Sequence, residues 1–487
     1  MTIAKPPVIF RTDGHTTMGL GHLFRSAALA EMLRPAYNCY LAFRYCPPSL
    51  LSDWVGAVYR DTIDLGSTEM SDEPGVLVEA IADRGWEEVT LVLDGYHFDY
   101  AYQLRLRKPP ARKVVCIDDL HTEKFCADLI VNHTPGIRAA NYRANPEVGY
   151  ALGLRFALLR SPFLHSGAGP TVATGSSSSL FVSLGGADPN NDTLRVLRHI
   201  REHTGSGAVT VDVVTGPAYR HVDSVREYVS AHPRLTVRLH HSLGAVAMAA
   251  LMRKAGAAIT SPSTVALEYL ATGGRLYLCQ TADNQAHLYR NLLVAGWAQD
   301  YTYWSPPSPV SDKLPQLPAI DGRQPGRFRK LFATLGLTYR PAGERDADLY
   351  FEWVNDPVVR AQSINSSTVA YSDHVRWFSG KLSDPATVML LFQREGTPVG
   401  QVRLELRGQE EALLNYSVAA VARGGGLGFS MLLYAENYLQ RHHPSVHRLV
   451  GMVKEQNFAS MATFRNLGYR EAPTEGGGLI KFVLHGV

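Results

Sequence analysis

Two glycine-containing stretches place chemically useful groups at the start of an expected helix. In the first, GLGHLFRS, His22 directly follows Gly21 and lies ahead of Arg25. A neutral imidazole beside a helix N-terminus stays available as a base near neutral pH, because the helix dipole disfavours its charged form. The stretch lacks the third glycine of a dinucleotide fingerprint and the Gly-Lys-Ser/Thr of a P-loop. The stretch therefore predicts a histidine whose side chain faces a cleft. The alternative is a histidine that only caps or packs a helix start.

The second stretch, RGGGLG, follows the strand-like run LLNYSVAAVA and precedes a helical pattern. Glycines in this position let backbone N–H groups approach a diphosphate, and the helix dipole adds positive potential. A glycine-rich turn that only ends the strand is the alternative. The residues expected at this anion-binding loop are Val418, Arg423, Gly424, Gly425, Gly426, Leu427 and Gly428.

Further polar groups stand at expected strand ends and helix starts between residues 183 and 285. The runs SLGGADPNNDT, TSPSTVALEYL and TADNQ carry them. Hydroxyl and N–H groups at a helix start suit a diphosphate, and a carboxylate about one turn later suits ribose hydroxyls. The residues concerned are Gly185, Gly186, Asp188, Ser263, Thr264, Glu268, Asn284 and Gln285.

Alternating strands and helices must position these groups. Continuous apolar runs such as VTLVLDGY and KVVCIDDLH are typical of parallel strands buried on both faces, with polar side chains at their carboxyl ends. A different pattern begins at Leu337, with a hairpin expected at Glu395-Gly396. We expect an α/β fold of two doubly wound Rossmann-like halves, residues 1–166 and 178–335, followed by an α+β domain, residues 337–487. The Gly- and Ser-rich stretch 167–179 is expected to link the halves, and the proline-rich stretch 304–318 interrupts the second.

Composition excludes several classes of partner. A net charge of +3 on 487 residues indicates neither nucleic acid nor a membrane surface, and the densest basic cluster, residues 323–330, is expected to be a solvated helix entry. Five cysteines without CxxC spacing and the lack of a long apolar segment favour a cytoplasmic protein. The histidines at 240–241 and 442–447 lack neighbouring ligands at metal-binding spacing, so we expect no metal.

The C-terminal motifs together resemble the GNAT acetyltransferase family over residues 337–487. A strand, R-x-x-G-x-G, a helix and then V-x-x-x-N-x-x-S…F-x-x-x-G-Y carry the likeness. The resemblance implies acetyl-CoA as co-substrate, with its diphosphate on the glycine loop and its pantetheine beside Asn457, where two strands splay apart. Many members have a tyrosine at the position of Phe464 that protonates the departing thiolate. Phenylalanine cannot donate a proton, so another group or water must do so. His374, Trp377 and Phe378 resemble the branch that acetylates nucleotide-linked amino sugars, or form one packed helix face.

The N-terminal motifs R-x-D…G-x-G-H-x-x-R, IDD, GGADP, ST-x-x-x-E and NQ resemble the nucleotide-sugar hydrolase of pseudaminic acid biosynthesis over residues 8–300. That family has a glycosyltransferase-B-like fold and removes UDP from UDP-2,4-diacetamido-2,4,6-trideoxy-β-L-altropyranose. The resemblance implies that His22 and Asp13 are catalytic, and that Asp13 and Arg11 line the same pocket. Gly21 and Arg25 would contact substrate, and the groups between residues 183 and 285 would hold UDP. Ser261-Pro262 replaces the usual glycine pair, and proline has no N–H to donate.

These resemblances predict a bifunctional enzyme that N-acetylates a UDP-linked amino-deoxysugar and then releases UDP by hydrolysis. The expected partners are the UDP-linked amino sugar and acetyl-CoA, without nucleic acid or membrane. Two alternatives remain for the N-terminal part. One is a glycosyltransferase of related fold, and the other is a non-catalytic module that binds the nucleotide sugar for the acetyltransferase.

Overall fold

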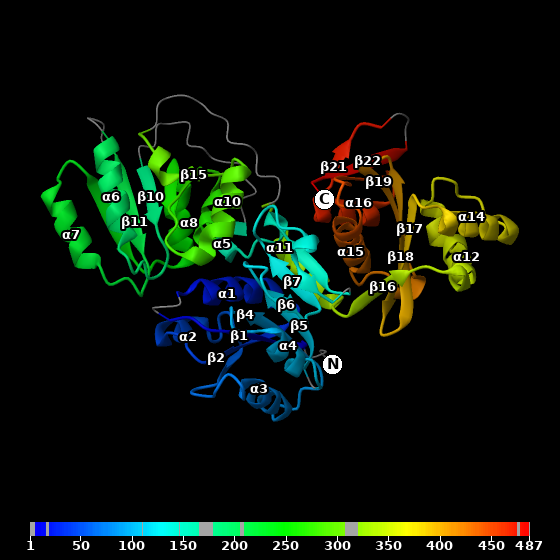
Figure 1. Cartoon of the computed structure of the whole chain (residues 1–487), viewed down its shortest axis with the longest axis horizontal. Coiled ribbons are helices and arrows are strands. Elements are labelled where there is room, and N and C mark those ends of the chain that lie inside the picture. The colour runs from blue at the N-terminus through cyan, green and yellow to red at the C-terminus, as the bar shows by residue number, and fades with distance from the viewer. Residues whose placement is uncertain are drawn as a thin grey trace. The chain divides into compact units, whose positions relative to one another are not determined.

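Three large β-sheets, supported by helices, organise the described part of the chain in the computed structural model (Figure 1). The structure describes residues 5–15, 19–109, 111–145, 147–164, 179–204, 209–306, 320–474 and 478–486. Most of the predicted linker and of the proline-rich stretch lies outside these described residues. Within them, no helix combines the length and the apolar character that crossing a membrane requires.

The first sheet has the strand order β3-β2-β1-β4-β5-β7-β9. Its first five strands in the chain pair in parallel, and β1 and β4 carry nearly continuous buried side chains, as the apolar runs predict. The strands are β1 (Pro7–Thr12), β2 (Asn38–Phe43), β3 (Asp61–Asp64), β4 (Val89–Asp94), β5 (Ala111–Ile117), β7 (Leu129–Asn132) and β9 (Gly149–Leu152). Two further short strands are β6 (Lys124–Phe125) and β8 (Arg143–Ala144). The helices here are α1 (Gly21–Leu33), α2 (Pro48–Trp54), α3 (Glu73–Ala82), α4 (Tyr100–Leu106) and α5 (Ser161–Leu164).

The second sheet has the order β12-β11-β10-β13-β14-β15, and all its neighbouring strands are parallel. Its strands are β10 (Ser179–Ser183), β11 (Thr210–Thr215), β12 (Thr236–His241), β13 (Ala257–Thr260), β14 (Arg275–Leu278) and β15 (Gln299–Asp300). Its helices are α6 (Asp192–His203), α7 (Val222–Ala231), α8 (Ala245–Lys254), α9 (Thr264–Thr272) and α10 (Ala286–Val294), with the short 3-10 helix η3 (Asp283–Gln285). The predicted mixed α/β fold with parallel Rossmann-like sheets is therefore confirmed.

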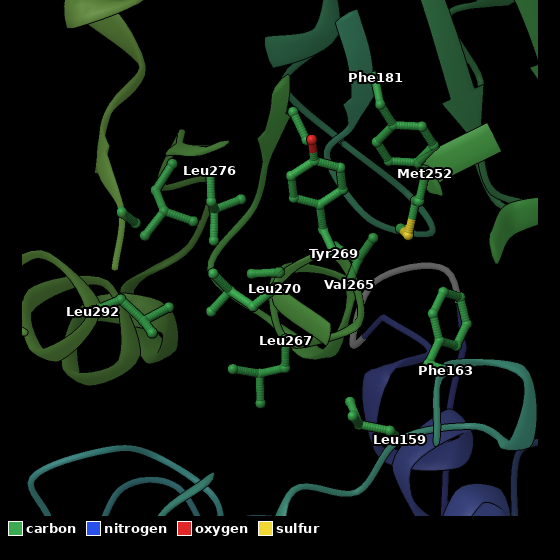
Figure 2. Packing of buried hydrophobic residues seen from close by; sticks show 14 of the residues in the cluster. Leu159, Phe163, Phe181, Met252, Val265, Leu267, Tyr269, Leu270, Leu276 and Leu292 are labelled. Atoms are coloured by element: carbon green, nitrogen blue, oxygen red, sulfur yellow. The ribbon is translucent and has the colours of Figure 1, made fainter. Parts of the chain in front are cut away.

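Helix α9 is held at its start by an apolar core (Figure 2). Val265, in the first turn of this helix, lies with Leu267 and Tyr269 in one buried cluster that also contains Phe163 of α5 and Phe181 of β10. The Tyr269 hydroxyl donates to the Ala255 carbonyl at 3.0 Å, so this buried phenol keeps a partner. The packing fixes the position of the α9 N-terminus, where several predicted ligands lie.

The third sheet has the order β16-β17-β18-β19-β20-β22-β21 and is antiparallel except for the parallel pair β19–β20. Glu395 and Gly396 both have positive φ, which confirms the predicted tight hairpin between β17 and β18. The strands are β16 (Leu337–Pro341), β17 (Thr387–Arg394), β18 (Thr397–Arg407), β19 (Glu411–Val418), β20 (Arg448–Lys454), β21 (Arg470–Ala472) and β22 (Leu479–His485). The helices are α11 (Gln324–Ala333), α12 (Ala347–Asn355), α13 (Pro357–Gln362), α14 (Tyr371–Ser383), α15 (Leu427–His442) and α16 (Phe458–Leu467).

The chain divides into two compact units. The first comprises Met1–Cys126, Val131–Ile137 and Leu152–Pro325, and the second comprises Ala127–Ile130, Arg138–Ala151 and Gly326–Val487. Residues 138–151 thus belong to the unit that contains the third sheet, although they lie far from that sheet in the sequence.

Helix α15 explains this membership. The Gln440 side chain accepts from the N–H of Ala139 at 2.8 Å, and the Asn437 amide donates to the Tyr150 carbonyl at 3.1 Å. A Cβ at Gly149 would stand 2.5 Å from the Tyr434 hydroxyl oxygen, so a larger residue there would force the Tyr434 ring to shift. A fragment of residues 337–487 would expose these buried polar groups, and experiments on the second unit therefore need the full chain.

Candidate active sites

A cavity of about 330 Å³ lies within the first unit, lined by residues of both parallel sheets. The α1 start contributes Gly21, His22 and Arg25, and the second sheet contributes its strand ends and helix starts. The structure thus brings together almost all residues that the sequence predicts for this pocket. From the second sheet these are Gly185, Gly186, Asp188, Ser263, Thr264, Glu268, Asn284 and Gln285.

His22 is oriented by a buried carboxylate. Its Nδ1 lies 2.6 Å from Oδ1 of Asp94, which ends strand β4 and is fully buried. A proton on Nδ1, donated to this carboxylate, leaves the Nε2 lone pair free to accept a proton. The ring edge of Tyr96 packs against the imidazole, with the ring centroids 4.8 Å apart. The pair has the geometry of a general base oriented by a carboxylate.

Arg25 keeps that carboxylate ionised. Its guanidinium donates to Asp94 from Nε at 2.9 Å and from Nη2 at 2.6 Å, and to Asp119 at 2.7 Å. Burial alone would raise the pKa of Asp94, but Arg25 and His22 outweigh it and hold the pKa at about 2. Sequence reasoning missed Asp94 as a site residue. Asp94 is the acidic residue that ends the apolar run VTLVLD, and this position could have indicated its role.

Arg11 and Asp13 do not line the cavity, contrary to the expectation from the sequence. Arg11 is fully buried and donates to both carboxylate oxygens of Glu73, at 2.6 and 2.8 Å. Asp13 pairs with Arg11 and accepts from the N–H groups of Arg44 and Tyr45 at 2.7 and 3.0 Å. Both charged side chains are therefore bonded inside the fold. The pair supports the loop after β1 and does not face a substrate.

Asn284 connects the second sheet to the first within this unit. Its amide donates to the Tyr96 hydroxyl at 2.9 Å, and that hydroxyl donates to Asp119 at 3.1 Å. The neighbouring Asp118 instead accepts from the N–H of His121 at 2.9 Å. Asp119 therefore lines the cavity, whereas Asp118 stabilises a turn.

Other predicted ligands already hold local partners. The carboxylate of Glu268 accepts from Arg160 at 2.6 and 2.7 Å, and Asp188 caps α6 by accepting from two N–H groups at 2.8 Å. The Gln285 side chain accepts from the N–H of Thr281 at 2.9 Å. Ser263 precedes α9 but makes no side-chain cap, so the N–H groups of Thr264 and Val265, two residues that line the cavity, are available to a ligand.

In the second unit, strands β19 and β20 separate. They pair only from Glu411 and Arg448 to Leu414 and Gly451. Beyond this point β19 continues along β18 as far as Val418, while β20 continues along β22. The divergence opens unpaired strand edges of the kind that an extended ligand can occupy.

The glycine loop lies at the end of β19. Gly424 and Gly426 both have positive φ, and Gly426 directly precedes the first turn of α15. Left-handed glycines before a helix turn successive N–H groups toward one point, which suits a bound anion. Val418 ends β19, and Leu427 and Gly428 open the helix, so the predicted loop residues are contiguous in space.

Asn457 and Phe464 lie on the facing element. The Asn457 side chain caps α16 by accepting from the N–H of Ser460 at 3.1 Å. Phe464 is buried, and its ring tip meets the backbone of Gly451, where a Cβ would collide with it. A hydroxyl added to this ring would therefore point into the sheet.

Tyr416, which the sequence analysis did not single out, lies on β19 where the strands diverge. Its hydroxyl lies 3.0 Å from Oγ of Ser460, and its ring contacts Phe464 edge-on with centroids 6.2 Å apart. Burial raises the pKa of Tyr416, so the phenol stays protonated at neutral pH. It is a candidate proton donor beside the separated strands.

Helix α14 supports the packing alternative for two of its three aromatic positions. His374 and Phe378 are both 2% exposed, and Nε2 of His374 lies 2.9 Å from the Ala347 carbonyl. Trp377 is 36% exposed, with the guanidinium of Arg403 5.0 Å from its ring centroid. Across the described part of the chain, no group of three or more His, Cys, Asp or Glu side chains is placed to hold a metal ion.

Comparison with known families identifies the class of the C-terminal part. Residues 336–470 match the model of the acetyltransferase (GNAT) domain. Together with the strand divergence and the glycine loop, this makes the C-terminal part of the chain a GNAT acetyltransferase domain.

Particular relatives were found as well. An uncharacterized protein of Methanocaldococcus jannaschii, MJ1062, is 23% identical over 296 residues, which cover 58% of this chain and 57% of that protein. The chain thus spans little more than half the length of this relative. Spermidine N-acetyltransferase from Vibrio cholerae, solved with CoA and spermine, covers 31% of this chain and 96% of its own at 13% identity and a TM-score of 0.29. Ribosomal-protein-alanine N-acetyltransferase from Brucella melitensis covers 30% and 98% at 26% identity and a TM-score of 0.26.

Proposed function

We propose that the chain is a bifunctional nucleotide-sugar enzyme of pseudaminic-acid-type biosynthesis with a glycosyltransferase-B-like N-terminal part. It transfers acetyl from acetyl-CoA to an amine of a UDP-linked amino-deoxysugar and then hydrolyses the bond between that sugar and UDP. One observation carries the second activity: a histidine oriented by a buried carboxylate faces the cavity where the nucleotide-binding candidates of the second sheet converge.

Acetyl-CoA is the co-substrate of the acetyltransferase. The glycine loop holds its diphosphate, and the separated strands β19 and β20 receive the pantetheine. The sugar amine attacks the thioester carbonyl as the free base. The carbon–sulfur bond then breaks, and the thiolate leaves with the electron pair. Tyr416 protonates this thiolate in place of Phe464, because its hydroxyl lies beside the separation. The nitrogen loses one proton to solvent as the amide forms, and a proton from solvent restores the Tyr416 phenol.

In the N-terminal cavity, Nε2 of His22 removes a proton from water while the water oxygen attacks the anomeric carbon. The bond from that carbon to the diphosphate oxygen breaks, and UDP leaves with the electron pair. Asp94 holds the imidazole and stabilises its protonated form. The open N–H groups at the start of α9 and the hydroxyls of Ser263 and Thr264 stabilise the departing diphosphate.

Time-resolved mass spectrometry tests both steps. The full chain is incubated with candidate UDP-4-amino-sugars and acetyl-CoA, and the acetylated UDP-sugar, free sugar and UDP are followed separately. We expect acetylation first and UDP release second, without any added acceptor. UDP release only in the presence of an acceptor alcohol would instead establish the glycosyltransferase, and acetylation without UDP release would establish the binding module.

A further inference from the structure

The arginine of the glycine loop is already paired. Nη2 of Arg423 lies 2.7 Å from Oδ1 of Asp356, and its Nε donates to the Val418 carbonyl at 3.2 Å. The guanidinium donates to Asp356 and so lowers the pKa of that carboxyl, which keeps it ionised at neutral pH. The positive charge that the motif contributes is therefore largely balanced by a neighbouring carboxylate.

A second cation stands beside the same loop. Lys330 lies on α11, before the part of the chain that matches the GNAT domain model. A Cβ at Gly426 would lie 3.1 Å from Cγ of Lys330, so the lysine stem packs directly on this left-handed glycine. Its Nζ lies 5.9 Å from the ring centroid of Phe429, in the first turn of α15. The Lys330 ammonium group thus lies near the N-terminus of α15, where the diphosphate of CoA is expected to bind.

Among the described residues, no negative charge balances that of Lys330. No described carboxylate lies within ion-pair distance of its Nζ, whereas burial and the guanidinium groups of Arg329 and Arg327 lower its pKa. The sequence alone suggested that this basic cluster is a solvated helix entry, and that expectation is wrong for Arg327. Arg327 is buried, and its Nε donates to the Asn466 carbonyl at 2.5 Å. The helix is therefore packed into the unit, and Lys330 is held in place.

We propose that Lys330 supplies the positive charge that binds the diphosphate of CoA, the role that Arg423 is prevented from filling by Asp356. The proposal rests on acetyl-CoA being the co-substrate. It extends the diphosphate site beyond the glycine loop to a helix that precedes the domain. An ammonium group acts on a phosphate as a point charge, so its contribution adds to the N–H groups of the loop without a fixed geometry.

The test is the affinity of the full chain for CoA, measured by titration calorimetry with Lys330→Met. Methionine keeps the aliphatic packing on Gly426 and Phe429 but removes the charge. We expect the affinity to fall on the order of 10-fold to 100-fold, with the loss shrinking as salt concentration rises. Lys330→Arg should retain most of the affinity, and the matched control Lys381→Met, whose lysine pairs with Glu405, should retain all of it.

Two truncated ligands distinguish binding to the diphosphate from binding to the 3′-phosphate. Dephospho-CoA lacks the 3′-phosphate but keeps the diphosphate, and S-acetylpantetheine lacks both. Lys330→Met should lose the same factor toward dephospho-CoA as toward CoA, and should use S-acetylpantetheine as well as the wild type does. An undiminished affinity of Lys330→Met for dephospho-CoA would overturn the proposal and assign the lysine to the 3′-phosphate.

A second variant keeps the proposal testable if Lys330→Met unfolds. Asp356→Asn preserves a cap for α13 while releasing the charge of Arg423, so it should tighten CoA binding in the otherwise native chain. Unchanged CoA affinity in Asp356→Asn would overturn the inference that pairing withholds Arg423. Failure of the wild-type chain to bind CoA at all would instead refute the proposed acetyltransferase co-substrate, which distinguishes the two failures.

Discussion

The two candidate sites differ in whether backbone groups or side chains form them. The acetyl-CoA site consists mainly of backbone: two strands that part after Leu414 and Gly451, and a glycine loop ahead of α15. The N-terminal cavity depends on side chains that reach each other across the fold, such as Asp94, His22 and Arg25. A backbone site tolerates many substitutions that leave its conformation intact, whereas a buried charged network fails when one member is removed. The contrast predicts where each site is fragile.

The largest effect is expected at His22. Replacing His22 with alanine should slow UDP release by about 10²–10⁴-fold, because the base that activates water is lost. Acetylation should proceed at the wild-type rate, since this histidine belongs to the other unit. His203→Ala, an exposed histidine at the end of α6, is the control. UDP release by His22→Ala at the wild-type rate would remove the catalytic assignment.

The buried ion pair between Arg160 and Glu268 should be the most sensitive structural element of the cavity. Arg160→Met leaves the Glu268 carboxylate, which is 2% exposed, without its bidentate partner. We expect the free energy of unfolding of the first unit to fall by about 3–5 kcal/mol. Denaturant unfolding followed by limited proteolysis measures this loss. The double variant Arg160→Met/Glu268→Gln should recover part of it, and no recovery would show that packing dominates.

Tyr416 tests the acetyltransferase chemistry. Tyr416→Phe should lower kcat by about 10²-fold with little change in the KM for acetyl-CoA, because proton donation occurs only as the thiolate leaves. Adding Phe464→Tyr should not restore activity, since that ring tip faces Gly451. Restoration by Phe464→Tyr would contradict this account of the proton donor.

Acid unfolding should report on Asp94. Its pKa in the folded chain is about 2, below the ordinary value near 3.8, so its ionised form stabilises the fold above about pH 4. This stabilisation is lost as the pH falls from about 4 toward 2, where the carboxylate takes up a proton in the folded state. Asp94→Asn should be less stable at neutral pH but should lack this part of the acid dependence. Identical acid profiles would refute the assignment.

The smallest effect is expected in the glycine loop, and it sharpens the contrast between the sites. A Cβ at Gly424 meets no neighbouring atom, so Gly424→Ala costs only the strain of a positive φ, about 1 kcal/mol. Gly451→Ala drives a methyl group into the Phe464 ring and should cost about 1–3 kcal/mol. Thermal unfolding of the two variants should rank them in this order, and the reverse order would contradict the packing described for Phe464.

Local patterns allowed the sequence to predict the strand–helix alternation, the hairpin at Glu395-Gly396 and the GNAT domain, because periodicity and glycine placement are readable over a few residues. Pairings between distant side chains were not readable. Asp94 meets His22 across 72 positions of the chain, and Asp356 meets Arg423 across 67. Arg11 and Asp13 look like site residues in the sequence, yet Glu73 and the N–H groups of Arg44 and Tyr45 engage them inside the fold.

The recruitment of residues 138–151 into the C-terminal unit has the same origin. No periodicity in that stretch indicates that Ala139 and Tyr150 will bond to α15. Tertiary contacts decide such membership, and they depend on the whole fold.

The most direct measurement of the central claim, that the N-terminal cavity hydrolyses a nucleotide sugar with activated water, uses H₂¹⁸O. The full chain is given the acetylated UDP-sugar in labelled water without acetyl-CoA, and the products are weighed by mass spectrometry. Attack at the anomeric carbon places one ¹⁸O in the free sugar and none in UDP, and His22→Ala should form neither product at an appreciable rate. Label in UDP, or no UDP release by the wild-type chain, would contradict the account.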